Sequence, residues 1–108
     1  MPVYDPTIWE GEAAQEFLQA IMWLDNKSAA EAFLADILTT NEINEFGNRL
    51  RTAKMLKNGK SYDEIQSVTG MSTTTIARVS EWLKTGAGGY ELVFRQMNVS
   101  DHSHISPS

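Results

Sequence analysis

Residues 61–84 read SYDEIQSVTGMSTTTIARVSEWLK, a pattern typical of two short helices joined by a tight turn. Ser61 and Glu64 form a capping box, in which the serine hydroxyl and the glutamate carboxylate each accept a backbone N–H at the helix start. Gly70 stands where the first helix must stop, because glycine enters the left-handed conformation without strain. Ser72 then offers the N-cap of a second helix. We interpret the stretch as a helix-turn-helix.

The apolar residues of this stretch have the spacing that two crossed helices need. Ile65 lies five residues before Gly70, while Ile76 and Val79 lie six and nine residues after it. Together with Val68, which we also expect on the inner face of the first helix, they predict a small core. The alternative is an ordinary helical hairpin with a glycine turn. A helix-turn-helix would place its second helix in the major groove of DNA.

Length and composition predict one folded domain, since the chain has 108 residues, 42% of them hydrophobic, and three tryptophans. The absence of cysteine excludes disulfides and cysteine-based zinc sites. The sequence has no apolar run of ~18 residues that could span a membrane, and its acidic start lacks the features of a signal peptide. We therefore expect a cytoplasmic protein with no cofactor. His102 and His104 lie in a polar tail and are poor evidence for a metal site.

The net charge of −5 is unevenly distributed along the chain. Residues 1–47 carry one cation and nine acids, whereas residues 48–84 carry seven cations and three acids. Positive charge is thus concentrated on and just before the helix-turn-helix, as expected of a protein that binds phosphates. Because the patch is modest, non-specific affinity for DNA should be weak and strongly dependent on salt.

Two helices are predicted ahead of this basic segment. Pro2 and Pro6 should keep residues 1–7 irregular. Residues 9–26 and 28–38 then carry apolar stripes, the second helix starting at a Ser28 capping box. Both stripes are wider than a surface helix needs, which indicates more than one packing neighbour for each helix.

A longer helix should follow, starting at a capping box of Thr39 and Glu42 and ending at Gly59. Its expected inward residues are Ile43, Phe46, Leu50, Ala53 and Leu56. Gly47 lies inside this helix, where glycine costs about 1 kcal/mol relative to alanine, so we expect another backbone to approach it.

The chain after residue 84 is less informative. A glycine-rich run at residues 86–89 breaks the helix, residues 90–97 are either a short helix or an extended segment, and the polar end is expected to be disordered. The predicted organisation of the single domain is 8–60 for dimerisation helices, 61–84 for the helix-turn-helix and 85–108 for a short C-terminal segment and tail.

Residues 38–84 contain several short motifs whose combination and spacing are typical of one protein family. They are Leu38-Thr39, Gly47-x-Arg49-x-Arg51, Ser61-x-x-Glu64, Gly70, Thr75-Ile76-x-Arg78 and Leu83-Lys84. In these motifs the chain resembles the tryptophan repressor superfamily, and more narrowly its Trp-repressor-like branch of the YerC/YecD type. The resemblance implies an all-α bacterial protein that forms an intertwined homodimer with two protruding helix-turn-helix units.

The resemblance also implies which residues meet double-stranded DNA. By matching positions, contacts to bases should come from the start of the second helix, namely Ser72, Thr73, Thr74, Thr75 and Ala77. Arg78 and Lys84 could reach phosphates, and Tyr62 could donate to one. Asp63 and Gln66 stand where the repressor has basic residues, which should lower the affinity. The alternative is that the threonine run is only a polar helix face.

A pocket for a small effector is the second site that the resemblance implies. In the repressor, residues matching Arg49 and Arg78 hold tryptophan, and residues matching Leu38 and Thr39 come from the partner chain. A glycine and a serine of that pocket are Val79 and Trp82 here, which removes space and adds an indole. We therefore expect no binding of free L-tryptophan and leave the identity of any effector open. The alternatives are that Arg49 is a solvated arginine and that Trp82 is a core residue.

These observations predict a sequence-specific, DNA-binding transcriptional regulator that acts as a homodimer. The sequence shows no set of residues arranged for catalysis, so we expect no enzyme. One alternative is a dimeric protein-interaction or scaffold module that has lost strong DNA binding. Another is the DNA-targeting domain of a transposase or integrase, although the chain carries no catalytic domain beside it.

Overall fold

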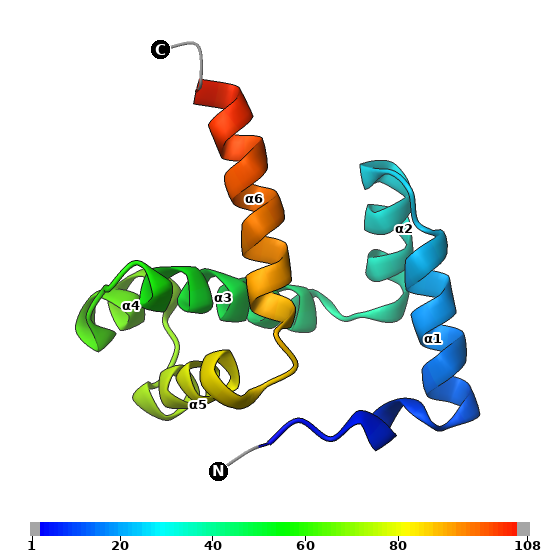
Figure 1. Cartoon of the computed structure of the whole chain (residues 1–108), viewed down its shortest axis with the longest axis horizontal. Helices are drawn as coiled ribbons and strands as arrows, with labels where there is room; N and C mark the ends of the chain where they lie inside the picture. The colour runs from blue at the N-terminus through cyan, green and yellow to red at the C-terminus, as the bar shows by residue number, and fades with distance from the viewer. Residues whose placement is uncertain (1–2, 106–108) are drawn as a thin grey trace. The chain divides into compact units, whose positions relative to one another are not determined.

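A computed structural model describes the backbone of residues 3–105 and the side chains of residues 3–97. All regular structure in this range is helical (Figure 1). The elements are a 3-10 helix η1 (Pro6–Trp9), α1 (Glu12–Trp23), α2 (Lys27–Ile37), α3 (Thr40–Lys57), α4 (Tyr62–Thr69), α5 (Thr73–Thr85) and α6 (Gly89–Ile105). The chain forms two compact units. One comprises residues 5–47, and the other comprises residues 48–105 together with residues 3–4, so that one boundary lies inside α3, between Gly47 and Asn48. None of the helices in the described range is long and apolar enough to cross a membrane.

The segment before α1 is more regular than its prolines suggest. Pro6 is the first residue of the 3-10 helix η1, and Asp5 caps this helix by accepting from the Thr7 backbone N–H at 3.0 Å. The expectation of an irregular residue 6 is therefore wrong, because a proline is tolerated where a helix has no use for its N–H. The Thr7 hydroxyl and then its backbone N–H, both donating to Asp5, lower the pKa of this carboxyl.

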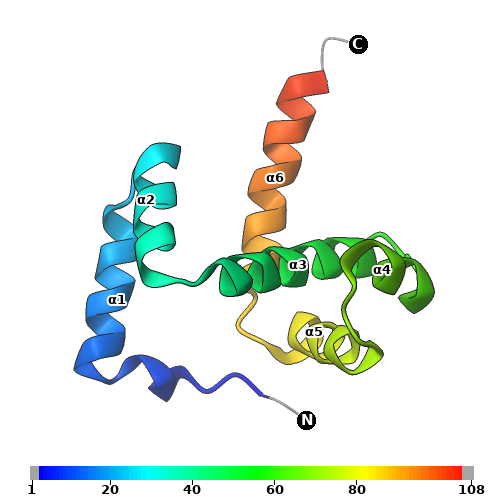
Figure 2. The same ribbon diagram turned by 180° about the vertical axis from the view of Figure 1, so that it is seen from behind.

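In the unit of residues 5–47, α1 and α2 lie side by side and run in opposite directions, as the two views agree (Figures 1 and 2). Phe17 and Phe33 join them, with ring centroids 6.2 Å apart. The start of α2 corrects our prediction: its N-cap is Asn26, which accepts from the Ala29 backbone N–H at 2.8 Å, and not Ser28. Asparagine is as good an N-cap as serine, so the earlier of two competing residues starts the helix.

No side chain of residues 5–47 is buried in the single chain. The large apolar side chains left exposed in this unit include Phe17, Ile21, Met22, Trp23, Ile37, Ile43 and Phe46. Trp23 is 75% exposed and Met22 is 70% exposed, far more than such residues usually are. The wide apolar stripes predicted for these helices are therefore present, and much of their surface is exposed within the unit.

The start of α3 confirms the predicted capping box. Thr39 Oγ1 accepts from the Glu42 backbone N–H at 3.1 Å, and the Glu42 carboxylate accepts from the Thr39 backbone N–H at 2.9 Å. The expectation for Gly47 is not met within the described chain, because a Cβ built there has no other heavy atom within 4 Å. The expected inward positions Ile43 and Phe46 are both more than two-fifths exposed.

The second unit holds the core of the protein. Ala53 from α3, Val79 from α5 and Phe94 from α6 form its buried centre. Partly buried residues packed around them are Leu50, Leu56, Leu83, Tyr90 and Met97. An ion pair also joins two of these helices, since Lys57 Nζ donates to both carboxylate oxygens of Glu91, the longer contact being 2.7 Å.

The last helix is longer than the sequence predicts. We expected at most a short helix over residues 90–97, whereas α6 runs from Gly89 to Ile105. The expectation of a disordered end is thus not met up to residue 105, and residues 106–108 lie outside the described range. Once Tyr90 and Phe94 hold the first turns against the core, each further residue adds one backbone hydrogen bond at little cost.

Candidate nucleic-acid interface and adjacent pocket

Local hydrogen bonds define both ends of the helix-turn-helix. Ser61 caps α4 by accepting from the Glu64 backbone N–H at 3.1 Å, and Ser72 caps α5 by accepting from the Thr75 backbone N–H at 3.1 Å. Gly70 has φ of 72°, in the left-handed region, and its N–H donates to the Gln66 carbonyl at 2.8 Å. These features confirm the two caps and the turn predicted from the sequence.

The interior of the helix-turn-helix is also largely as predicted. Ile65 and Ile76 are fully buried and Val79 is 3% exposed. Val68 is 54% exposed, so its assignment to the inner face of α4 is wrong. The partly buried residue on that side is the next one, Thr69. Its hydroxyl donates a hydrogen bond to the Ile65 carbonyl of the same helix at 2.8 Å. A threonine can face inward here because this bond satisfies its hydroxyl.

The turn is anchored to α3 by an unusual contact. Thr52 is fully buried, and its hydroxyl donates to the sulfur of Met71 at 3.2 Å. Since Met71 follows Gly70 directly in the turn, this bond connects the bend of the helix-turn-helix to the long helix behind it.

The predicted DNA-contact residues divide into two groups. Thr73, Thr74, Ala77 and Arg78 are exposed at the start of α5, with Lys84 exposed near its end. The hydroxyls of Ser72 and Thr75 instead form a hydrogen bond with each other, with the two oxygens 3.1 Å apart. On α4, Tyr62, Asp63 and Gln66 are also exposed.

The cations of this unit do not all face the same way. Thr52 and Ala53 mark the buried side of α3, so Arg51 and Lys54, both exposed, lie on its opposite side. Lys57 is engaged by Glu91. The positive charge beside the exposed end of α5 is therefore smaller than the segment's total charge suggests.

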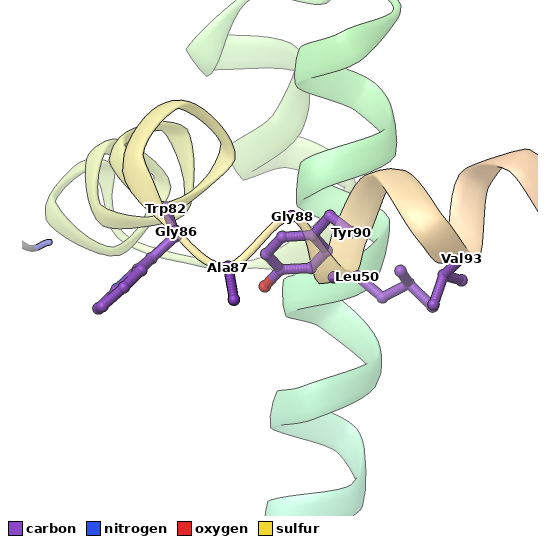
Figure 3. Close-up of a pocket in the computed structure, with 8 residues that line it drawn as sticks. Leu50, Trp82, Gly86, Ala87, Gly88, Tyr90 and Val93 are labelled. Carbon is purple, nitrogen blue, oxygen red and sulfur yellow. The ribbon is translucent and has the colours of Figure 1, made fainter. Parts of the chain in front are cut away.

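A pocket of about 470 Å³ lies where α5 passes into α6 (Figure 3). It is lined by Leu50, Trp82, Gly86, Ala87, Gly88, Gly89, Tyr90 and Val93, which belong to α3, α5, the glycine-rich linker and α6. The indole of Trp82 lies on one side of the linker and the ring of Tyr90 on the other (Figure 3). Burial raises the pKa of the Tyr90 hydroxyl, and the positive charge of Arg49 acts in the opposite direction.

This pocket differs from the effector site predicted from the sequence. Of the six predicted residues, Trp82 is the one among its described lining residues. Val79 is instead a core residue, Arg49 and Arg78 are exposed on α3 and α5, and Leu38 and Thr39 belong to the other unit.

From the sequence, the linker was predicted only to break the helix. The sequence feature that indicates this pocket is an aromatic residue on either side of the glycine run, at residues 82 and 90.

Trp82 also explains one of the linker glycines. A Cβ built on Gly86 would lie 2.5 Å from the Trp82 carbonyl oxygen and 3.0 Å from its ring atom Cε3. The same carbonyl accepts from the Gly86 backbone N–H at 2.9 Å, so the two residues are held in close contact. Trp82 itself is 41% exposed and therefore lines the surface of this pocket; it is not a core residue.

Comparison with known proteins assigns the chain to a family. The family described as Trp repressor protein matches residues 12–98. A relative from Bacillus subtilis, the uncharacterized protein YerC, is 32% identical over 91 residues, which cover 84% of this chain and 88% of that protein.

Solved structures agree with this assignment. A TrpR-like protein from Eubacterium eligens has a TM-score of 0.80 and 36% identity, covering 85% of this chain and 95% of the other. A second, from Staphylococcus aureus, has a TM-score of 0.76 and 39% identity, covering 82% and 88%. With its capped helix-turn-helix and its all-helical fold, the chain is a Trp-repressor-like protein of the YerC type and belongs to the Trp repressor family, a family of regulators.

Proposed function

We propose that this protein is a sequence-specific, DNA-binding transcriptional regulator that acts as a homodimer. The observation that carries the proposal is the start of α5, where Thr73, Thr74, Ala77 and Arg78 are exposed on a helix fixed by caps and a buried core. Exposed residues at the N-terminal end of a second helix are those that contact base edges in a helix-turn-helix protein.

The unit of residues 5–47 supports the homodimer. Its exposed apolar side chains, including Trp23 and Met22, would cost free energy in water if nothing covered them. A second copy of the chain, interlocking through the same helices, would cover them symmetrically. Two symmetric helix-turn-helix units should then contact half-sites about 34 Å apart.

Selection of binding sites from random DNA tests the proposal. We expect a palindromic motif with half-sites about one helical turn apart, bound by a species of twice the protomer mass in sedimentation. Thr73→Ala and Thr74→Ala should each weaken binding to that site by about 5-fold to 10-fold, the loss of one to two contacts. Thr40→Ala, at the exposed first position of α3, is the matched control and should bind as the wild type does. If no sequence is enriched even at low salt, the regulator proposal fails.

We also infer that the regulator does not respond to free L-tryptophan. Val79 is 3% exposed and packs with Ala53 and Phe94, so its side chain occupies the position where the repressor has a glycine beside the ligand. Isothermal titration with L-tryptophan should give no heat of binding up to millimolar concentration. Saturable binding in the micromolar range would contradict this inference.

A second candidate function is a dimeric protein-interaction module. It is favoured by the net charge of −5 and by Asp63, an exposed acid in the first turn of α4 that would repel phosphates. The two candidates differ in the selection experiment, because only the regulator enriches a sequence whose binding weakens steeply with salt.

A further inference from the structure

The hydroxyl groups at the start of α5 are not equally available to DNA. Ser72 Oγ accepts from the Thr75 backbone N–H at 3.1 Å and lies 3.1 Å from Thr75 Oγ1. These two hydroxyls hold the helix start together, and Thr75 is partly buried. Breaking this arrangement to contact a base would remove the N-cap, which is worth about 1 kcal/mol.

The exposed residues of the first turn and a half are Thr73, Thr74 and Ala77, with Arg78 beside them. Thr73 and Ala77 are four positions apart and Thr74 and Ala77 three, so the three side chains share one face of the helix. Each ends in a methyl group. Within the described part of the chain, the structure gives the Thr73 and Thr74 hydroxyls no hydrogen-bond partner.

This face lacks the side chains that read purines. Bidentate contacts to guanine need arginine or lysine, and those to adenine need asparagine or glutamine. Residues 72–77 contain none of these four residue types. Arg78, the next residue, is the one for which the resemblance implies a phosphate contact. The free threonine hydroxyls can bond to more than one base and therefore discriminate little between them. The methyl groups, by contrast, distinguish a base that carries an apolar group on its edge. In the major groove that group is the 5-methyl of thymine.

We propose that the exposed methyl groups of Thr73, Thr74 and Ala77 recognise thymine 5-methyl groups, so that each half-site is specified by its thymines. This inference rests on the proposed function and names what its site reads. Ser72 and Thr75 position the helix and do not read bases. Thr73 and Thr74 are the specificity-determining residues that can be tested without disturbing the backbone.

The experiment combines a change in the protein with a change in the DNA. Each thymine of the selected half-site is replaced in turn by deoxyuridine, which removes only the 5-methyl group. We expect about a fourfold loss of affinity at one or more positions, the value of one buried methyl. Thr73→Ser and Thr74→Ser remove one methyl from the protein and should cost about as much on unmodified DNA.

The most informative measurement combines a serine variant with a deoxyuridine replacement. For a threonine and a thymine in contact, the double change should cost about fourfold, not the roughly sixteenfold expected of independent sites. Thr40→Ser, also at a helix start, is the matched control and should leave every deoxyuridine effect unchanged. If a site is selected but no deoxyuridine weakens binding, or both serine variants leave its effect unchanged, the methyl-recognition proposal is overturned while the regulator stands. If no sequence is selected, the proposed function fails first.

Discussion

Replacing Ile76 by alanine is expected to lower the free energy of unfolding by about 2–5 kcal/mol and to abolish specific DNA binding. Ile76 is fully buried and belongs to the core that sets α5 against α4, together with Ile65 on the other helix. Removal of its side chain leaves a cavity at the crossing of two short helices. Val79, the other buried apolar residue of α5, is smaller and belongs to the cluster with Ala53 and Phe94.

Urea unfolding followed by circular dichroism measures the loss, at one protein concentration because dimerisation would contribute to stability. Val68→Ala is the matched control, since Val68 lies in the same helix-turn-helix but is 54% exposed. We expect its cost to be within about 0.5 kcal/mol. Equal costs for the two variants would show that this core does not determine the stability of the unit.

Replacing Gly86 by alanine is the second change with a large expected effect, about 1–3 kcal/mol of destabilisation. The new Cβ would lie 2.5 Å from the Trp82 carbonyl oxygen, which no rotamer change can relieve because that oxygen belongs to the backbone. The end of α5 must therefore shift. The linker that places Tyr90 and Phe94 on the core must shift with it.

Gly89→Ala, at the first residue of α6 directly after the linker, is the matched control. A Cβ at Gly89 meets no heavy atom within 4 Å of the described chain, and the residue does not have a positive φ. Since alanine is favoured over glycine in a helix, this variant should be as stable as the wild type or up to about 1 kcal/mol more stable. Thermal unfolding of the two variants side by side checks the prediction, and a Gly86→Ala protein that melts at or above the wild-type midpoint would contradict it.

The sequence predicted best those features that depend on neighbouring residues. The caps at Thr39, Ser61 and Ser72 and the left-handed Gly70 each depend on residues no more than four positions away, and all four are confirmed. Val68 was misplaced because spacings of three and four residues both keep a side chain near the same face, and only packing against α5 decides between them.

Features that depend on distant residues were not predictable in the same way. The pocket beside Trp82 joins residues of α3, α5 and α6, so no local pattern indicates it. The sequence also could not predict which hydroxyls at the start of α5 are free. Serine and threonine can make several local hydrogen bonds, and the bond between the Ser72 and Thr75 hydroxyls is only one of them.

Within residues 61–85, the residues that hold the fold differ from those that are exposed, and this separation has a consequence for evolution. Ile65, Ile76 and the two serine caps hold the fold, whereas Thr73 and Thr74 are exposed and make no described contact that the fold needs. In the proposed regulator, mutations at the exposed positions would therefore alter which DNA sequence is recognised at almost no cost in stability. Under that proposal, a lineage of such proteins would acquire new target genes one substitution at a time, while its architecture stays constant.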